Sequence, residues 1–286
     1  MPSPDEPVTV EQQLAKAARD CRVPTIMLED TWMHPLERFS RDGKKLDLGI
    51  VPDRICVLDA QALQDLKNIG MPRNRLIVTH NPLYDGVVSG SNKIRKKTRE
   101  GVRILFVSQP IIENMPMKDW GYTQQSLFEE LLRAFERWSS PAKKEILVWV
   151  HSRECSTRWA PASLRIPDSI EVTISEDRSA EIMKNVDFIV TGHSTVVYEA
   201  LYYDRPCVSL RIGGSSLAPL ITDVLGLTTL IETREELARY LREERYRSIP
   251  AELHRKRKEL LRKNIFFSDG KAIDRVLDVI WEVIGR

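Results

Sequence analysis

The segment Phe188–Thr195, FIVTGHST, passes directly from an apolar run into a small polar turn, and residues 196–202 continue it with helical spacing. A short apolar run that ends at glycine is typical of a buried strand. A strand that leads through a short turn into a helix is the repeating unit of an α/β protein. The segment therefore favours an α/β fold with a doubly wound parallel sheet, and the rest of the chain supports this interpretation.

Eight further apolar runs of strand length repeat the pattern, with amphipathic segments between them. They cover residues 25–28, 54–58, 75–79, 103–107, 145–150, 170–174, 206–210 and 228–231. Runs that are apolar on both faces are typical of parallel strands buried under helices. Six of the nine runs fall in residues 103–286, which predicts a complete open sheet there. Residues 1–92 supply only three strands, which form a poor hydrophobic core by themselves. We therefore expect this partial domain to pack against residues 103–286 or to pair with another chain.

The segment between the two blocks is strongly basic. Residues 93–102 carry five lysine and arginine side chains against the single carboxylate of Glu100. No apolar helix face can be drawn through them, which predicts a solvated linker. The alternative is a basic patch that faces a phosphate group or an anionic membrane.

Composition excludes several classes of protein. The 286 residues carry 43 basic and 41 acidic side chains, so a net charge of +2 gives no global polycation for nucleic acid. The longest apolar run, Ile146–Val150, is far too short to span a membrane. The N-terminus is polar and does not resemble a signal peptide. The four cysteines form no C-x-x-C pair, and Cys56 and Cys207 lie in apolar runs as core residues do. These features predict a cytoplasmic protein with at most peripheral membrane contact.

Ligands of open parallel sheets bind beyond the carboxyl ends of the strands. The turn after residue 191 holds Gly192, Ser194 and Thr195 at the start of a predicted helix, where free N–H groups favour an anion. Ser194 and Thr195 are candidates to donate to phosphate; plain helix capping is the alternative. Glu199 shares a helix face with Thr195 and is a candidate to accept two ribose hydroxyls, or is a solvated helix residue.

Other predicted strand ends carry further candidates for a nucleotide site. Ser108 follows one strand, and His151 and Arg153 follow the next, where Arg153 could hold phosphate or form a surface salt bridge with Glu154. The adjacent glycines Gly213 and Gly214 could let the backbone approach a diphosphate closely. The alternative is a simple loop.

Catalytic groups are harder to find in the sequence. His193 is a candidate proton shuttle, with a hydrogen-bonded loop histidine as the alternative, and Asp30 is the other candidate acid or base. No D-x-D pair and no zinc-type His/Cys spacing occurs, so we expect no metal. The absence of G-x-G-x-x-G, P-loop and G-x-S-x-G patterns removes the main support for NAD(P), P-loop and serine-hydrolase interpretations.

Several segments, taken together, resemble GT-B glycosyltransferases and related nucleotide-sugar enzymes of the bacterial surface-polysaccharide type. The segments are 23–32 with 37–39, 52–58 with 70–82, 151–154, 192–200 with 205–208, and 267–272. The most specific are the closure of the first domain at residues 70–82 and the "G.ST…EA…..P.v" signature at residues 192–208. The resemblance covers most of residues 9–286. It departs from the family at His80, where glycine is usual, and at Ser152, which replaces proline in the "HPRE" turn.

This resemblance implies two Rossmann-like domains, the first of them lacking its first half. It implies that Ser194, Thr195 and the following backbone hold a diphosphate, that Glu199 binds ribose, and that His151 and Arg153 face the phosphates or the sugar. It implies no bound metal and no cofactor other than the nucleotide-diphosphate sugar substrate. A homo-oligomer or a partner chain could supply the missing half.

Three functional hypotheses follow. The first is a nucleotide-sugar-dependent glycosyltransferase of polysaccharide or glycoconjugate synthesis, or its donor-binding half. The second is a nucleotide-sugar 2-epimerase or hydrolase, for which the sequence shows no clear set of carboxylates. The third is a truncated non-catalytic homologue that acts with a partner chain.

Overall fold

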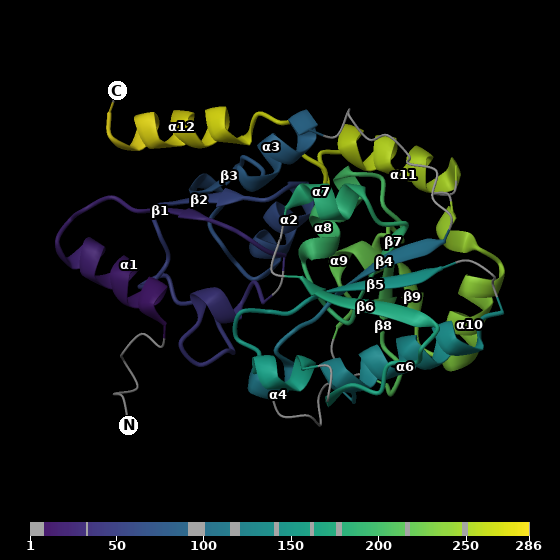
Figure 1. The fold of residues 1–286 in the computed structure, drawn as a ribbon. Coiled ribbons are helices and arrows are strands. Elements are labelled where there is room, and N and C mark those ends of the chain that lie inside the picture. Colours follow the sequence, from purple (N-terminus) through teal and green to yellow (C-terminus); the bar gives the residue numbers. More distant parts are fainter. Residues whose placement is uncertain are drawn as a thin grey trace. The chain divides into compact units, whose positions relative to one another are not determined.

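The computed structural model describes residues 9–32, 34–90, 101–114, 121–139, 143–160, 163–175, 179–214, 218–247 and 251–285, and Figure 1 shows the fold. Contacts divide the chain into two units. Unit 1 is Met1–Gly90 together with Arg255–Arg286, and unit 2 is Ser91–His254. Each unit is built around its own parallel sheet.

The sheet of unit 2 has six parallel strands in the order β6-β5-β4-β7-β8-β9. The strands are β4 (Val102–Val107), β5 (Lys144–Trp149), β6 (Ile170–Ser175), β7 (Phe188–Thr191), β8 (Cys207–Leu210) and β9 (Thr229–Ile231). The chain builds outward from β4 in one direction and then from β7 in the other. This confirms the predicted doubly wound sheet.

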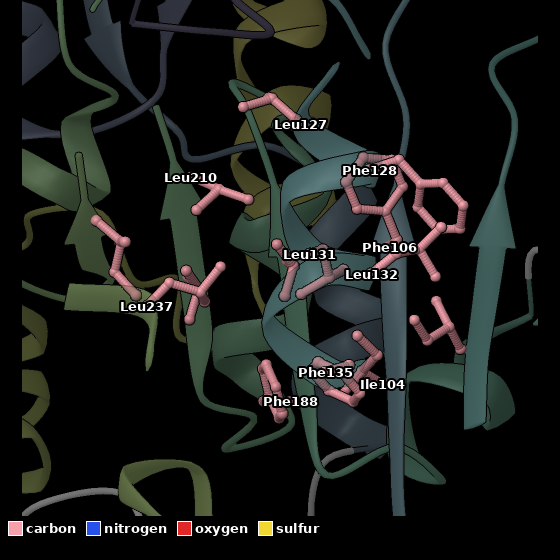
Figure 2. Packing of buried hydrophobic residues seen from close by; sticks show 14 of the residues in the cluster. Ile104, Phe106, Leu127, Phe128, Leu131, Leu132, Phe135, Phe188, Leu210 and Leu237 are labelled. Carbon is pink, nitrogen blue, oxygen red and sulfur yellow. The ribbon is translucent and has the colours of Figure 1, made fainter. Parts of the chain in front are cut away.

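Helices cover this sheet because successive strand residues point to opposite faces and both sets are apolar. On one face, Leu127, Phe128 and Leu131 of α6 pack on Ile104 and Phe106 of β4 (Figure 2). Helix α10 contributes to the same cluster. A capping box marks its start, since Thr233 and Glu236 bond reciprocally. The helices of unit 2 and its boundary are α4 (Ile111–Asn114), α6 (Gln124–Arg137), α7 (Ala180–Lys184), α8 (Val196–Tyr202), α9 (Ile221–Val224), α10 (Arg234–Arg242) and α11 (Ala251–Arg262), with short 3₁₀ turns η4 (Ser156–Trp159) and η6 (Arg245–Arg247).

Unit 1 contains a three-stranded parallel sheet in the order β1-β2-β3. Its elements are β1 (Ile26–Leu28), β2 (Arg54–Val57), β3 (Leu76–Val78), α1 (Val10–Asp20), α2 (Ala60–Asn68), α3 (Leu83–Gly90) and α12 (Ala272–Val283), with 3₁₀ turns η1 (Glu37–Phe39) and η2 (Arg73–Arg75). Ile55 and Val57 of β2 pack in one cluster with α2, whereas Cys56 between them packs with Val276 and Val279 of α12. The sheet is therefore covered on both faces.

The position of the C-terminal segment differs from the prediction that residues 103–286 form one domain. Residues 255–286 group with unit 1. Asp85 of α3 accepts hydrogen bonds from the backbone N–H groups of Ala272 and Ile273 and so caps α12. Apolar residues repeat along α12 at helical spacing. Val276 and Val279 are buried, but Ile273, Leu277, Trp281 and Ile284 are exposed, so the repeat does not say which of these residues the helix buries or which sheet it covers.

His80 stands where the resembled family usually has glycine, and its backbone keeps the conformation that glycine favours, with φ of 64°. Its imidazole Nε2 bonds the side chain of Asn264. The histidine therefore gives a side-chain link to the returning C-terminal segment that glycine could not provide.

Of the predicted linker 93–102, residues 93–100 lie outside the described part of the chain, and β4 begins at Val102. Among the described residues, no helix is long and apolar enough to cross a membrane. Cys56 and Cys207 are buried, as their apolar surroundings predict.

Asp59 joins α2 to the C-terminal segment of unit 1, and its substitution tests how much this connection stabilises the fold. Its buried carboxylate accepts from Ala62 N at 2.7 Å, from Phe266 N at 2.6 Å and from Trp32 Nε1 at 2.9 Å. We expect Asp59→Ala to lower the free energy of unfolding by about 3 kcal/mol, because a helix cap and two further buried donors lose their acceptor.

Urea unfolding followed by circular dichroism measures this change. Asp20→Ala is the control: Asp20 is exposed and pairs only with Lys16 at the surface, so we expect a loss below about 0.5 kcal/mol. An equal, small loss in both variants would contradict the structural role of Asp59.

Candidate functional site

The carboxyl edge of the unit 2 sheet has its topological switch point between β4 and β7, which are adjacent but lead to opposite sides of the sheet. In open α/β sheets a ligand crevice forms where the strand order reverses. The loops that follow these two strands contain Ser108 and the segment 192–195. Both loops were selected from the sequence as candidates, and the topology brings them side by side.

Gly192 holds the two loops close together. A Cβ atom at this position would lie 2.9 Å from Cδ1 of Leu127 and 3.3 Å from Oε1 of Gln109. The next backbone N–H, that of His193, donates to the same Gln109 Oε1 at 2.5 Å. A larger residue here would have to displace the side chains of Leu127 and Gln109, and Gln109 joins the ends of β4 and β7.

Ser194 and Thr195 differ in how their hydroxyls are used. Ser194 Oγ accepts from Val196 N at 3.3 Å, which is a local turn bond. Thr195 stands at the cap position of α8 but makes no side-chain capping bond, and its side chain is exposed. The cap residue of α8 therefore makes no capping bond, and the Ser194 hydroxyl, which only accepts in its turn bond, can still donate.

Glu199 lies one helical turn beyond Thr195 on α8. It is half-buried, and within the described residues its carboxylate makes no hydrogen bond or ion pair. Burial raises the pKa of this carboxyl above its usual value. A fully solvated helix glutamate, the alternative from the sequence, does not fit this burial.

The loop after β8 contains Gly213 and Gly214, both in the left-handed backbone region with φ of 119° and 75°. A Cβ on Gly213 would lie 2.5 Å from the carbonyl oxygen of Gly121, which precedes α6. At Gly214 a Cβ would meet nothing within 4 Å. The pair therefore lets two loops approach closely while one side of Gly214 stays open.

His193 is buried and bonded. Its Nε2 donates to the carbonyl of Ala218 at 3.0 Å, and burial, helped by the nearby Arg211 guanidinium, lowers the pKa of the imidazole. The ring is therefore neutral at pH 7, with Nε2 engaged by the backbone. This is the geometry of the hydrogen-bonded loop histidine that the sequence offered as the alternative to a proton shuttle.

The turn after β5 is organised by Glu154. Its buried carboxylate accepts from Ser108 Oγ at 2.8 Å, from Trp159 Nε1 at 2.9 Å and from the backbone N–H of His151 at 2.8 Å. The predicted alternative for Arg153, a salt bridge with Glu154, is not formed. The Arg153 guanidinium is exposed and makes no ion pair within the described residues, while its backbone N–H donates to Nδ1 of His151.

Unit 1 carries two adjacent carboxylates after β1. Asp30 is exposed and pairs with Arg38 at 2.8 Å. Glu29 is 5% exposed, accepts one hydrogen bond from Leu58 N, and burial raises its pKa to about 7. A carboxyl group that titrates near neutral pH is suited to proton transfer, so Glu29 has the property for which the sequence suggested Asp30.

Three residues of these edges were not selected from the sequence: Gln109, Glu154 and Glu29. Gln109 and Glu154 join loops through hydrogen bonds to residues far away in the sequence, and the pKa of Glu29 is raised by burial. A sequence pattern shows neither long-range hydrogen bonds nor burial. The weak signal for Glu29 is its place directly after a strand. Within the described residues, no group of three or more His, Cys, Asp or Glu side chains could hold a metal ion.

No protein-family model matches the sequence, and the search of curated proteins finds no match. Solved structures do match. S. aureus MnaA, in a structure with UDP, has a TM-score of 0.64 at 14% identity, covering 100% of this chain and 81% of that chain. The Methanocaldococcus jannaschii UDP-GlcNAc 2-epimerase has a TM-score of 0.60 at 14% identity, covering 94% and 72%. Anabaena HepE in complex with UDP has a TM-score of 0.56 at 10% identity, covering 94% and 76%. The chain thus has the GT-B fold that the resemblance implies.

The pKa of Glu29 makes a testable contribution to stability. Between its ordinary value of 4.5 and about 7, the unfolded chain loses the Glu29 proton while the folded chain keeps it. The contribution of Glu29 to the free energy of unfolding therefore falls by about 3 kcal/mol as pH rises through this window. Below and above the window this contribution is constant.

We expect the stability of the native protein, relative to Glu29→Gln, to fall by this amount between pH 4.5 and pH 8. Urea unfolding at a series of pH values measures it, with Glu37→Gln on an exposed side chain as the control. Parallel pH curves for the native protein and Glu29→Gln would contradict the shifted pKa.

Proposed function

We propose that the protein is an enzyme that acts on a nucleoside-diphosphate sugar and binds its nucleotide at the carboxyl edge of the unit 2 sheet. One observation carries the proposal. At the switch point, Thr195 presents an exposed hydroxyl and Glu199, one turn further along α8, presents a half-buried carboxylate, and neither side chain has a hydrogen-bond partner in the described structure.

The proposed phosphate groups would be held by Ser194 and Thr195, with Arg153 and His151 at the end of β5. Arg153 has an exposed guanidinium that pairs with no carboxylate of the described residues, and a guanidinium fork suits a phosphate. Fixed donors that face a leaving diphosphate stabilise the charge that develops as its bond to the sugar breaks. Donors of this kind carry the proposed chemistry without a resident metal.

The proposed role of Glu199 is to accept two hydroxyls of the ribose. A half-buried carboxylate without partners is costly in the free protein, and two hydroxyl donors would satisfy both of its oxygens. The comparisons support a uridine nucleotide as the first probe. The structures of MnaA and HepE are named as complexes with UDP, and the Methanocaldococcus epimerase as a complex with UDP-GlcNAc and UDP.

We propose transfer of the sugar to an acceptor as the reaction. A second candidate is 2-epimerisation or hydrolysis of the nucleotide sugar. Such a reaction needs acid/base residues, and Glu29, a buried carboxyl with a pKa of about 7, has the pKa that such a residue needs. Several solved structures of the same fold are also named UDP-GlcNAc 2-epimerases.

The nucleotide site predicts the behaviour of two variants. Ser194→Ala and Glu199→Ala are each expected to weaken UDP binding about tenfold or more, because each removes a hydrogen bond that involves a charged group. Isothermal titration calorimetry measures the affinity. Glu181→Ala, on an exposed glutamate of α7, is the control and should bind UDP as the native protein does. Unchanged affinity in both site variants would refute the assigned site.

The two reactions predict different products from UDP-GlcNAc alone. A transferase leaves the compound unchanged until an acceptor is added, whereas an epimerase or hydrolase converts it without one. Proton NMR of the mixture distinguishes an epimer, free sugar with UDP, and unreacted substrate. If conversion occurs without acceptor, we expect Glu29→Gln to abolish it while Glu37→Gln retains it. UDP binding without any turnover, with or without acceptors, would instead support the non-catalytic alternative.

A further inference from the structure

A groove on unit 2 lies between α6 and α10, apart from the carboxyl edge of the sheet. Its volume is about 550 Å³, within the range of small-molecule pockets. Four arginines line it, Arg133 and Arg137 from α6 and Arg234 and Arg242 from α10. We call it the arginine groove. Among the described residues that line it, Glu130 is the one acidic side chain.

The charges at one end of the groove are compensated. Arg234 donates to both oxygens of Glu130, from Nε at 2.6 Å and from Nη2 at 2.7 Å, and these bonds lower the pKa of the Glu130 carboxyl. Arg133 donates to Glu130 as well and to Glu129 at 2.8 Å. Two guanidinium groups thus share two carboxylates, and this end of the groove is a closed ionic network.

The other end is not compensated. Arg137 and Arg242 line the same groove, and within the described residues neither makes a hydrogen bond or an ion pair. The ammonium group of Lys144 donates to the carbonyl oxygens of Phe135 and Trp138, at 2.6 Å each, at the end of α6. These two carbonyl groups therefore already have a donor and do not compensate the charges of Arg137 and Arg242. Two uncompensated positive charges therefore face one concave surface.

The surroundings of these charges suit a ligand with a non-ionic part. Trp138 lines the groove and is held by an edge contact with Tyr246 at 5.8 Å between ring centroids. Ala134, Leu237 and Ala238 supply an apolar floor. Indole faces and small apolar side chains pack against a sugar ring, while guanidinium forks bind phosphate oxygens.

We propose that the arginine groove is a second anion site, which binds a small organic phosphate through Arg137 and Arg242 and packs its carbon skeleton against Trp138. The site is independent of the proposed nucleotide site, since it uses other elements of unit 2. Arg239, in the last turn of the same helix, does not line the groove and provides a matched comparison.

Calorimetric titration with inorganic pyrophosphate and with glucose 1-phosphate, at low ionic strength and with UDP present in excess, tests the proposal. The native protein should bind both, and glucose without phosphate should not bind. Arg137→Gln/Arg242→Gln should weaken both affinities about tenfold or more, because each arginine contributes charge-assisted hydrogen bonds. Arg239→Gln should bind as the native protein does.

A second variant keeps both arginines. Ala238→Glu places a carboxylate on an exposed helical position within the groove, where it should pair with a guanidinium and weaken phosphate binding without unfolding α10. Equal affinity in the native protein and the double variant would overturn the proposal. An equal loss in Arg239→Gln would also overturn it, since the effect would then be general surface charge. Failure of UDP to bind would refute the proposed nucleotide site and leave these comparisons valid.

Discussion

Parallel strands expose apolar side chains on both faces, so each sheet of this protein depends on helices that cover it twice. Unit 2 satisfies this requirement with helices drawn from its own crossovers. Unit 1 does not, because the segments that connect its three strands leave the face of Cys56 to be covered by α12. Helix α12 closes that face with Val276 and Val279, and Asp85 and Asp59 fix the returning segment through its backbone N–H groups. The division of the chain into two units follows from this single need for cover.

The same principle decides where polar groups can act. Strands β4, β7 and β8 are buried on both faces, so the polar groups that follow them lie in the loops at the carboxyl edge. There Gln109 joins the ends of β4 and β7, and Glu154 joins the ends of β4 and β5. These bonds hold the loops in place, and within the described residues the side chains of Thr195, Glu199 and Arg153 make no hydrogen bond or ion pair. Side chains on a fixed frame suit ligand binding, because they lose little conformational entropy when the ligand binds.

Local patterns in the sequence predicted the strands but did not predict how the elements group. All nine strands lie where apolar runs end at glycine or polar residues, and the capping box at Thr233 marks the start of α10. The return of residues 255–286 to unit 1 depends on which sheet lacks cover, and an amphipathic stripe does not carry that information. In the candidate site, the small polar turn at residues 192–195 was visible, whereas the part played by Glu154 depends on Ser108 and Trp159, which reach it only in the folded chain.

The contrast among the buried carboxylates bears on function. Glu154 is as buried as many core residues, but three donors satisfy it, so it stabilises the loops that it joins. Glu29 has one hydrogen bond and Glu199 has none in the described structure, and burial raises the pKa of both. A buried carboxyl with so few donors is less favourable for folding than an apolar residue of similar size. Structural need explains Glu154 and leaves Glu29 and Glu199 unexplained. A role in proton transfer would explain the buried carboxyl of Glu29. Two ribose hydroxyls would give the Glu199 carboxylate the hydrogen-bond donors that it lacks in the described structure.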